Sequence, residues 1–320
     1  MSSKEGPIVL LRPEDIKGHN PYAVKKFDGK LDLGKEGERG KGKFLFFFGK
    51  RGSGKSVAMR YMMYQNRDKF WTAVAMSAVA NTWRDYETYF PKSMVYDEVD
   101  LDALQRIWDV CDKYQETVHL EKHPVTGRKV AFEMELGNVL VAIDDGSDKK
   151  NALDNDQMRT IAKKGRHNCM TYMLATQNFI AVPNDQRTNA DMILVGKEPS
   201  SGGRQKLFKY FFKSVFDKFA EFNLFMDEYT TDYRFMVFNK NADSTPSECM
   251  SVFKPEYDIE PFRIGHRDMW VRDLLFRKRA ISSSLSAVRK ELDGGLDTDG
   301  LSALDRFTLE DCSQLARGQA

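Results

Sequence analysis

The stretch "FLFFFGKRGSGKS", residues 44–56, joins an unbroken apolar run to a glycine-rich turn, a lysine and a serine. Residues 49–56 satisfy the pattern G-x-x-x-x-G-K-[ST], which forms a phosphate-binding loop when a strand precedes it and a helix follows it. The apolar run at 44–48 predicts the strand, and the helical pattern from Ser56 to Gln65 predicts the helix. We therefore interpret this stretch as the start of an α/β domain that binds a phosphorylated ligand.

The chemistry of this loop follows from its residue types. Glycines let the backbone turn tightly and direct successive N–H groups at phosphate oxygens, and the start of the helix adds a positive partial charge. Lys55 is expected to reach the β- and γ-phosphates, and Ser56 to bind Mg²⁺. ATP and Mg²⁺ are thus the predicted ligands. The predicted phosphate-binding residues are Gly49, Lys50, Arg51, Gly52, Ser53, Gly54, Lys55 and Ser56.

Composition sets the broad class. The chain has 320 residues, 41% of them hydrophobic and 30% charged, which fits one large soluble domain with appendages. A formal net charge of +2 does not by itself indicate a nucleic-acid binder. The four cysteines are far apart, as expected in a reducing compartment. No run approaches the roughly 18 apolar residues of a membrane span, so we expect no span and a cytosolic location.

Strand and helix patterns alternate along the chain. This alternation favours a mainly parallel central sheet flanked by helices, and the continuous apolar runs indicate that both faces of the sheet are buried. Further strands are expected at 71–77, 93–97, 138–145, 170–177 and 191–195, and further helices at 100–114 and 154–164.

The segments around this pattern suggest a domain organisation. We expect a lead-in segment at 1–43, an ATPase core at 44–240, a C-terminal extension at 241–280 and a flexible acidic tail at 281–320. Within the core, residues 116–137 predict an inserted hairpin with its turn at Pro124–Gly127.

Two segments late in the core are rich in aromatic residues. Residues 207–222 carry phenylalanines at helical spacing, which predicts one helix that packs on the sheet or, alternatively, faces a partner subunit. Residues 233–239 predict a strand that closes the sheet.

Polar residues follow two of the buried strands. Asp144 and Asp145 end the run "NVLVAIDD", and Gln177 ends "MTYMLATQ". Because such positions lie at the carboxyl ends of parallel strands, we expect Asp144 to hold the Mg²⁺ ion and Asp145 to activate water as a general base. Gln177 is expected to sense the γ-phosphate or to position the water. A solvated turn is the alternative reading of the aspartates.

Hydrolysis between subunits also needs a cation over the γ-phosphate. Arg166 and Arg187 flank the strand that ends in Gln177 and are the leading candidates, with Arg84 as a third. A positive stretch lies farther along the chain and is interpreted either as a solvated helix face or as a contact for a phosphate backbone. It contains Lys197, Arg204, Lys206, Lys209, Lys213 and Lys218.

Taken together, the motifs resemble the genome-packaging ATPases of large DNA viruses, the poxvirus type, within the FtsK–HerA group of DNA-pumping ATPases. The resemblance covers about residues 44–240 and rests on these stretches: GKRGSGKS (49–56), MSAVANTWRDYETYFPKSMVYDEVD (76–100), VAIDDGS, GRHNCMTYMLATQ (165–177) and PNDQRTNADMILVG (183–196).

This resemblance implies a RecA/ASCE-like P-loop NTPase that works as a homo-oligomeric ring, a hexamer or a pentamer. It further implies a motor that hydrolyses ATP and moves double-stranded DNA into a capsid. The partners would be DNA and a capsid or portal protein, and the locations the viral assembly site in the host cytoplasm and the virion. Two other classes stay open from the residues alone: a P-loop phosphotransferase, such as a small-molecule or nucleoside kinase, and a nucleotide switch that does not hydrolyse.

Overall fold

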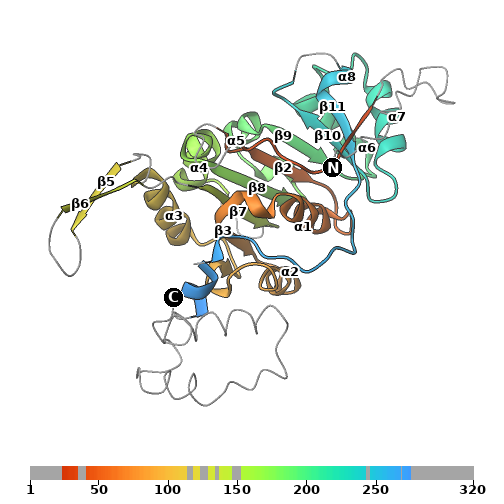
Figure 1. Cartoon of the computed structure of the whole chain (residues 1–320). Helices are drawn as coiled ribbons and strands as arrows, with labels where there is room; N and C mark the ends of the chain where they lie inside the picture. Colours follow the sequence, from red (N-terminus) through yellow and green to blue (C-terminus); the bar gives the residue numbers. More distant parts are fainter. Residues whose placement is uncertain are drawn as a thin grey trace, which may run out of the picture.

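The computed structural model describes residues 24–34, 41–113, 118–122, 129–133, 137–145, 153–242, 246–267 and 269–274. A nine-stranded sheet forms its centre, in the order β1-β11-β10-β9-β2-β8-β7-β3-β4 (Figure 1). The strands of this sheet are β1 (Lys25–Phe27), β2 (Phe44–Phe48), β3 (Phe70–Ser77), β4 (Val95–Tyr96), β7 (Asn138–Asp144), β8 (Met170–Thr176), β9 (Met192–Val195), β10 (Phe235–Asn239) and β11 (Met250–Phe253).

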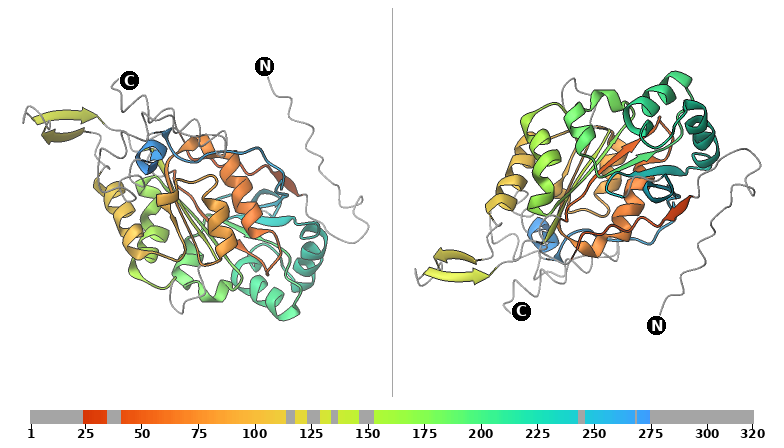
Figure 2. Two further views of the ribbon diagram at one scale, coloured as in Figure 1. Left: turned by 90° about the horizontal axis from the view of Figure 1, so that it is seen from below. Right: turned by 90° about the horizontal axis from the view of Figure 1, so that it is seen from above.

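Helices connect these strands and cover the sheet. They are α1 (Lys55–Gln65), α2 (Ala80–Tyr86), α3 (Leu101–Lys113), α4 (Asp156–Lys164), α5 (Asn184–Asn189), α6 (Ser201–Leu207), α7 (Phe219–Tyr229) and α8 (Pro246–Cys249). A separate hairpin, β5 (Val118–Lys122) with β6 (Lys129–Glu133), lies outside the main sheet (Figures 1 and 2). Among the helices of these described residues, none has the length and apolar character needed to cross a bilayer.

The sheet is mainly parallel, as the alternating pattern predicts. β9, β2, β8, β7, β3 and β4 run in one direction, each parallel to its neighbour. β10 is antiparallel to both β9 and β11, while β1 is parallel to β11. The α/β prediction is therefore confirmed, with an antiparallel addition on one side.

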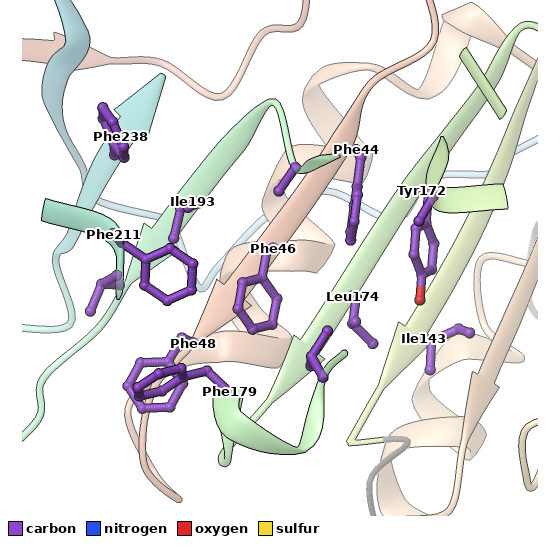
Figure 3. Close-up of a cluster of buried hydrophobic side chains, with 14 of the residues drawn as sticks. Phe44, Phe46, Phe48, Ile143, Tyr172, Leu174, Phe179, Ile193, Phe211 and Phe238 are labelled. Carbon is purple, nitrogen blue, oxygen red and sulfur yellow. The ribbon is translucent and has the colours of Figure 1, made fainter. Parts of the chain in front are cut away.

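Both faces of the sheet are buried. Along β2, Phe44, Phe46 and Phe48 point to one face of the sheet and lie in one layer of buried side chains (Figure 3). Residues of α3, α4, α6 and α7 belong to the same buried cluster. Leu45 and Phe47 point to the opposite face, which α1 and α2 cover (Figure 2). The five consecutive apolar residues of β2 are thus explained by burial on two sides.

The single helix expected at 207–222 is wrong. α6 ends at Leu207, a π-helical segment spans Phe208–Phe212, and α7 begins only at Phe219. In one straight helix Phe212 and Phe222 would lie about 15 Å apart along the axis. The break lets their rings stack at 5.0 Å instead. Helical spacing identified most of the buried residues correctly, but packing between the rings decides the backbone.

The prediction that residues 233–239 form the strand that closes the sheet is also wrong. β10 forms within 233–239, but β11 and β1 continue the sheet beyond it. Both added strands come from segments that composition assigns to the C-terminal extension and the lead-in. Leu31 and Leu33, which follow β1, are buried in the core as well.

Some expectations fall on residues that the structure does not describe. The hairpin turn at Pro124–Gly127 and the acidic tail at 281–320 lie outside the described residues.

The strand expected at 93–97 is shorter than predicted, because Lys92–Met94 form a 3₁₀ turn and only Val95–Tyr96 pair with β3.

The phenylalanine cluster gives a test of this packing. Phe212 is fully buried and its ring contacts those of Phe216, Phe222 and Phe238. Phe212→Ala is expected to lower the free energy of unfolding by about 3–5 kcal/mol, because the cavity it leaves cannot fully collapse. Urea unfolding followed by circular dichroism measures this change. Leu224→Ala on the exposed side of α7 is the control, and an equally small effect of both substitutions would contradict burial within one chain.

Candidate functional site

The glycine-rich loop leaves the carboxyl end of β2 and leads directly into α1. Gly52 and Gly54 have φ values of +76° and +88°, a region that only glycine adopts readily. At Gly49 an added Cβ would lie 2.3 Å from the Ser53 hydroxyl, so a side chain there would displace Ser53. The Ser53 amide donates to the Lys50 carbonyl at 3.1 Å and closes the turn. The local fold is thus the strand, turn and helix that the sequence predicts for this stretch.

Lys55 opens α1 and is the buried cation of the loop. Its side chain is largely enclosed, and its ammonium group donates to the Lys50 carbonyl at 3.2 Å. Burial lowers the pKa of Lys55, and the nearby Asp144 and Asp145 carboxylates oppose that shift. A phosphate anion on the loop would favour the charged form of Lys55 in the same way.

Strand order brings the two predicted polar strand ends together. β8 lies between β2 and β7, and all three strands are parallel, so their carboxyl ends share one edge of the sheet. Thr176, the last residue of β8, pairs with Phe48 just before the loop. Asp144, the last residue of β7, pairs with Ala175 of β8. Gln177 therefore follows a strand that separates the phosphate loop from the two aspartates.

Asp144 is a buried carboxylate that faces the phosphate loop. It is 2% exposed, and burial raises its pKa. A hydrogen bond from Ser56 and the charge of Lys55 partly offset the rise. A serine hydroxyl paired with a carboxylate is an oxygen donor set of the kind that Mg²⁺ prefers. The residues present therefore fit the predicted magnesium position.

Asp145 and Gln177 form a hydrogen-bonded pair. The Gln177 amide donates to the Asp145 carboxylate at 2.8 Å. The Asp145 backbone has φ +55°, which is uncommon outside glycine, and its amide donates to the Ala175 carbonyl at 3.0 Å. The turn at the end of β7 thus directs the second aspartate toward the end of β8. This pairing joins the two residues expected to handle water.

Sequence reasoning missed two residues at this site. Tyr86 of α2 is fully enclosed, and its hydroxyl donates to Asp144 at 3.4 Å. Glu198, after β9, is completely buried, and its carboxylate lies 3.4 Å from the Lys50 ammonium group while it accepts from the Ser200 hydroxyl at 2.7 Å. No local signal connects Glu198 with the loop, because its charged partner Lys50 is 148 positions away (198 − 50) in the chain.

The predicted arginines are not brought to the phosphate loop. Arg166 precedes β8, at the amino ends of the strands, where it forms a 3.1 Å ion pair with the buried Asp191. Arg187 on α5 is 8% exposed, donates to the Phe179 carbonyl at 3.3 Å and stacks on the Tyr210 ring. Both are held by contacts within their own chain. Arg84 on α2 is exposed and lies over the Trp83 ring.

The residues of the positive stretch differ in burial: one is buried and the others are exposed. Arg204 is buried and paired with Asp227 at 2.7 Å, so it does not belong to an accessible basic face. The other positive residues of the stretch are exposed on and around α6 and the π-helical segment; they are Lys197, Lys206, Lys209, Lys213 and Lys218.

Comparison with known proteins finds relatives among large DNA viruses. No family model matches the chain. The uncharacterized protein 088R of Invertebrate iridescent virus 3 is 25% identical over 263 residues, which are 80% of this chain and 90% of the relative. The uncharacterized protein 015R of Frog virus 3 is 26% identical over 273 residues, 82% of this chain and 74% of the relative.

Solved structures with a similar fold include the genome packaging NTPase B204 from Sulfolobus turreted icosahedral virus 2 in complex with AMP. That match has a TM-score of 0.46 and 16% identity, and it covers 67% of this chain and 98% of the other. EssC (ATPases 2 and 3) from Geobacillus thermodenitrificans gives a TM-score of 0.46 at 12% identity, over 74% of this chain and 44% of the other.

The buried carboxylate predicts a pH-dependent stability difference. Because the folded-state pKa of Asp144 is raised, the cost of ionising it is absent below the unfolded-state pKa and complete above the folded-state value. Without nucleotide, Asp144→Asn is therefore expected to become more stable relative to wild type as pH rises from about 4.

Urea unfolding of both proteins across this pH range measures the difference. Asp68→Asn is the matched control, because the Asp68 side chain is 86% exposed. A difference between Asp144→Asn and wild type that stays constant with pH would contradict the shifted pKa.

Proposed function

We propose that this protein is an ATP-hydrolysing motor that translocates double-stranded DNA and packages a viral genome into the capsid. The observation that carries the proposal is the Asp145–Gln177 hydrogen bond at the ends of β7 and β8, beside the Lys55 phosphate loop. This arrangement gives the terminal phosphate of a nucleotide a binding loop on one side and a water-handling pair on the other.

Binding is assigned to the loop. Its backbone N–H groups and the start of α1 would hold the phosphates, while Lys55 would exchange its bond to the Lys50 carbonyl for the β- and γ-phosphate oxygens. Ser56 and Asp144 would hold Mg²⁺, which neutralises charge on the phosphates when it is bound. Tyr86 fixes the Asp144 carboxylate through its hydroxyl.

Hydrolysis is assigned to the neighbouring pair. Asp145 would accept a proton from the attacking water as a general base. Gln177, which donates to that carboxylate, would hold it in position and orient the water toward the γ-phosphate. Neither role needs a covalent intermediate on the protein.

The Asp145–Gln177 pair also helps to distinguish hydrolysis from the two alternatives, a phosphotransferase and a nucleotide switch that does not hydrolyse. A kinase must admit an acceptor hydroxyl to the position where water would attack and must then exclude water. Here the Asp145 carboxylate and the Gln177 amide would occupy that position, and in the described stretch from α4 to β8 the chain forms a short 3₁₀ turn and no inserted lid. A non-hydrolysing switch would have no use for the pair. The first argument favours the hydrolase over the phosphotransferase, and the second favours it over the switch.

DNA is the proposed polymer because an exposed basic face accompanies the site. Lys206, Lys209 and Lys213 are exposed at helical spacing, which suits contact with a phosphate backbone. The relatives in Invertebrate iridescent virus 3 and Frog virus 3 support a role in a large DNA virus, with a capsid or portal protein as the further partner. The assembly site in the host cytoplasm and the virion are the corresponding locations.

A homo-oligomeric ring, hexameric or pentameric, is part of the proposal. In a ring, an arginine from one copy can lie over the γ-phosphate bound to the next copy. Of the three arginines considered, Arg84 is the exposed one, and it shares α2 with Tyr86, which contacts Asp144. We therefore prefer Arg84 to Arg166 and Arg187 for this role.

Turnover of ATP tests the proposal directly. Wild-type protein is expected to hydrolyse ATP faster when double-stranded DNA is added. Asp145→Asn should bind ATP but lose about 100-fold or more in turnover, because the general base is removed. Lys55→Ala should lose both nucleotide binding and turnover. Phosphate release and calorimetric binding measure the two quantities.

Thermal unfolding of each variant serves as the control for folding. Phosphorylation of a small acceptor at a rate unaffected by DNA would overturn the motor. Normal turnover by folded Lys55→Ala would overturn the assignment of the phosphate loop.

The basic face gives a separate test of DNA binding. Changing Lys206, Lys209 and Lys213 together to alanine should remove the stimulation by DNA and leave basal turnover intact. The slope of log affinity against log salt should fall in magnitude by about 0.9 for each DNA phosphate that the variant no longer neutralises. Unchanged DNA affinity would show that this face does not touch the DNA.

A further inference from the structure

A cavity of about 900 Å³ adjoins the phosphate loop. Loop and helix residues form one wall, including Gly54 and Val57. The other lining residues are Lys26 of β1, the turn at Asp232–Tyr233 and the strap at residues 254–258. A nucleotide whose phosphates lie on the loop must extend its sugar and base into adjoining space. The volume is within the range of small-ligand sites, about 300–1,000 Å³.

Strand direction explains why two distant segments meet here. β10 runs antiparallel to β9, so it begins at the edge where β2 and β9 end, and the turn before it reaches the phosphate loop. β11 reverses direction again, and its last residue, Phe253, pairs with Phe235 at the start of β10. The strap that follows β11 therefore leaves the sheet at the same edge.

Tyr233 is an exposed ring held beside the loop. Its side chain is 64% exposed although its backbone lies in the left-handed region, at φ +56°. A Cβ added at Gly54 would be 3.4 Å from the Tyr233 ring, so the ring lies against the phosphate-loop backbone. A large aromatic residue in this conformation is uncommon away from functional sites.

Tyr257 is the second exposed ring of the cavity, at 75% exposure. Arg60 of α1 holds it in two ways: the guanidinium donates to the Tyr257 carbonyl at 2.8 Å and lies 5.3 Å from the ring centre. The strap is further tied to the turn by an ion pair between Lys254 and Asp232. The turn and the strap that carry the two rings are therefore held to each other by the ion pair, and the strap is held to α1 by Arg60.

We propose that Tyr233 and Tyr257 bind the base of the nucleotide by stacking, which makes this cavity the base site of the protein. The inference rests on the proposed function, because it presumes that the loop holds the phosphates. Stacking engages the π-face that every base has, so ATP and GTP should both be retained. A polyphosphate that carries no base should gain nothing from the two tyrosines.

Calorimetric titration with ATP, GTP and inorganic tripolyphosphate tests the proposal. Tyr233→Ala and Tyr257→Ala should each weaken ATP and GTP binding by about 10-fold while leaving tripolyphosphate affinity unchanged. Tyr233→Phe and Tyr257→Phe keep the rings and should bind ATP like wild type. Leu224→Ala, an exposed apolar change on α7, is the surface control.

The outcomes separate this inference from the proposed function. Lys55→Ala should lose affinity for all three ligands, because it acts on the phosphates. If both alanine variants bind ATP like wild type while Lys55→Ala does not, the base site is wrong and the phosphate loop stands. An equal loss of tripolyphosphate affinity in the tyrosine variants would also overturn the stacking role. If the wild type binds no ATP, the proposed function itself fails.

Discussion

The site depends on one constraint, the insertion of β8 between β2 and β7 in a sheet of parallel strands. The carboxyl ends of the three strands must then lie in a row at one edge. The row runs from the phosphate loop through Gln177 to Asp144 and Asp145. If β7 paired directly with β2, the carboxylates would be adjacent to the loop and Gln177 could not lie between them. Strand order thus brings together side chains that come from three distant parts of the sequence.

Burial of charged side chains is the second feature on which the candidate site depends. Burial lowers the pKa of Lys55 and raises that of Asp144, so both side chains are pushed toward their neutral forms, and each partly restores the other. Glu198 is buried behind the loop near Lys50. Desolvated groups interact more strongly with a ligand charge than exposed groups do. The same burial that disfavours the charged forms of these side chains would therefore strengthen the interaction of the proposed site with phosphate and a divalent cation.

The candidate site at this edge of the sheet could be predicted from the sequence, because each of its segments has a recognisable local sequence pattern. A continuous apolar run predicts a strand buried on both sides, and a polar residue at its end predicts the edge of the sheet where the candidate site lies. Glu198, Tyr233 and Tyr257 carry no such signature, since their roles depend on which strands pair. The same holds for β1 and β11, which are short and join the sheet only through long-range pairing. The break before α7 was missed because aromatic spacing fits a straight helix as well as an interrupted one.

Energetics also decide which arginine could serve a neighbouring copy. To reach another subunit, Arg166 would have to leave its ion pair with Asp191, which is 2% exposed. Asp191 would keep its hydrogen bonds from the Phe44 amide and the Asn241 side chain but would lose a charged partner in a buried position, where ion pairs are screened least. Arg187 would have to leave a buried position where it donates to the Phe179 carbonyl. Among contacts with the described residues, Arg84 would give up the one with the Trp83 ring, worth about 0.5–1 kcal/mol at an exposed site. Closeness in sequence to the Gln177 strand favoured Arg166 and Arg187, but the cost of releasing each side chain favours Arg84.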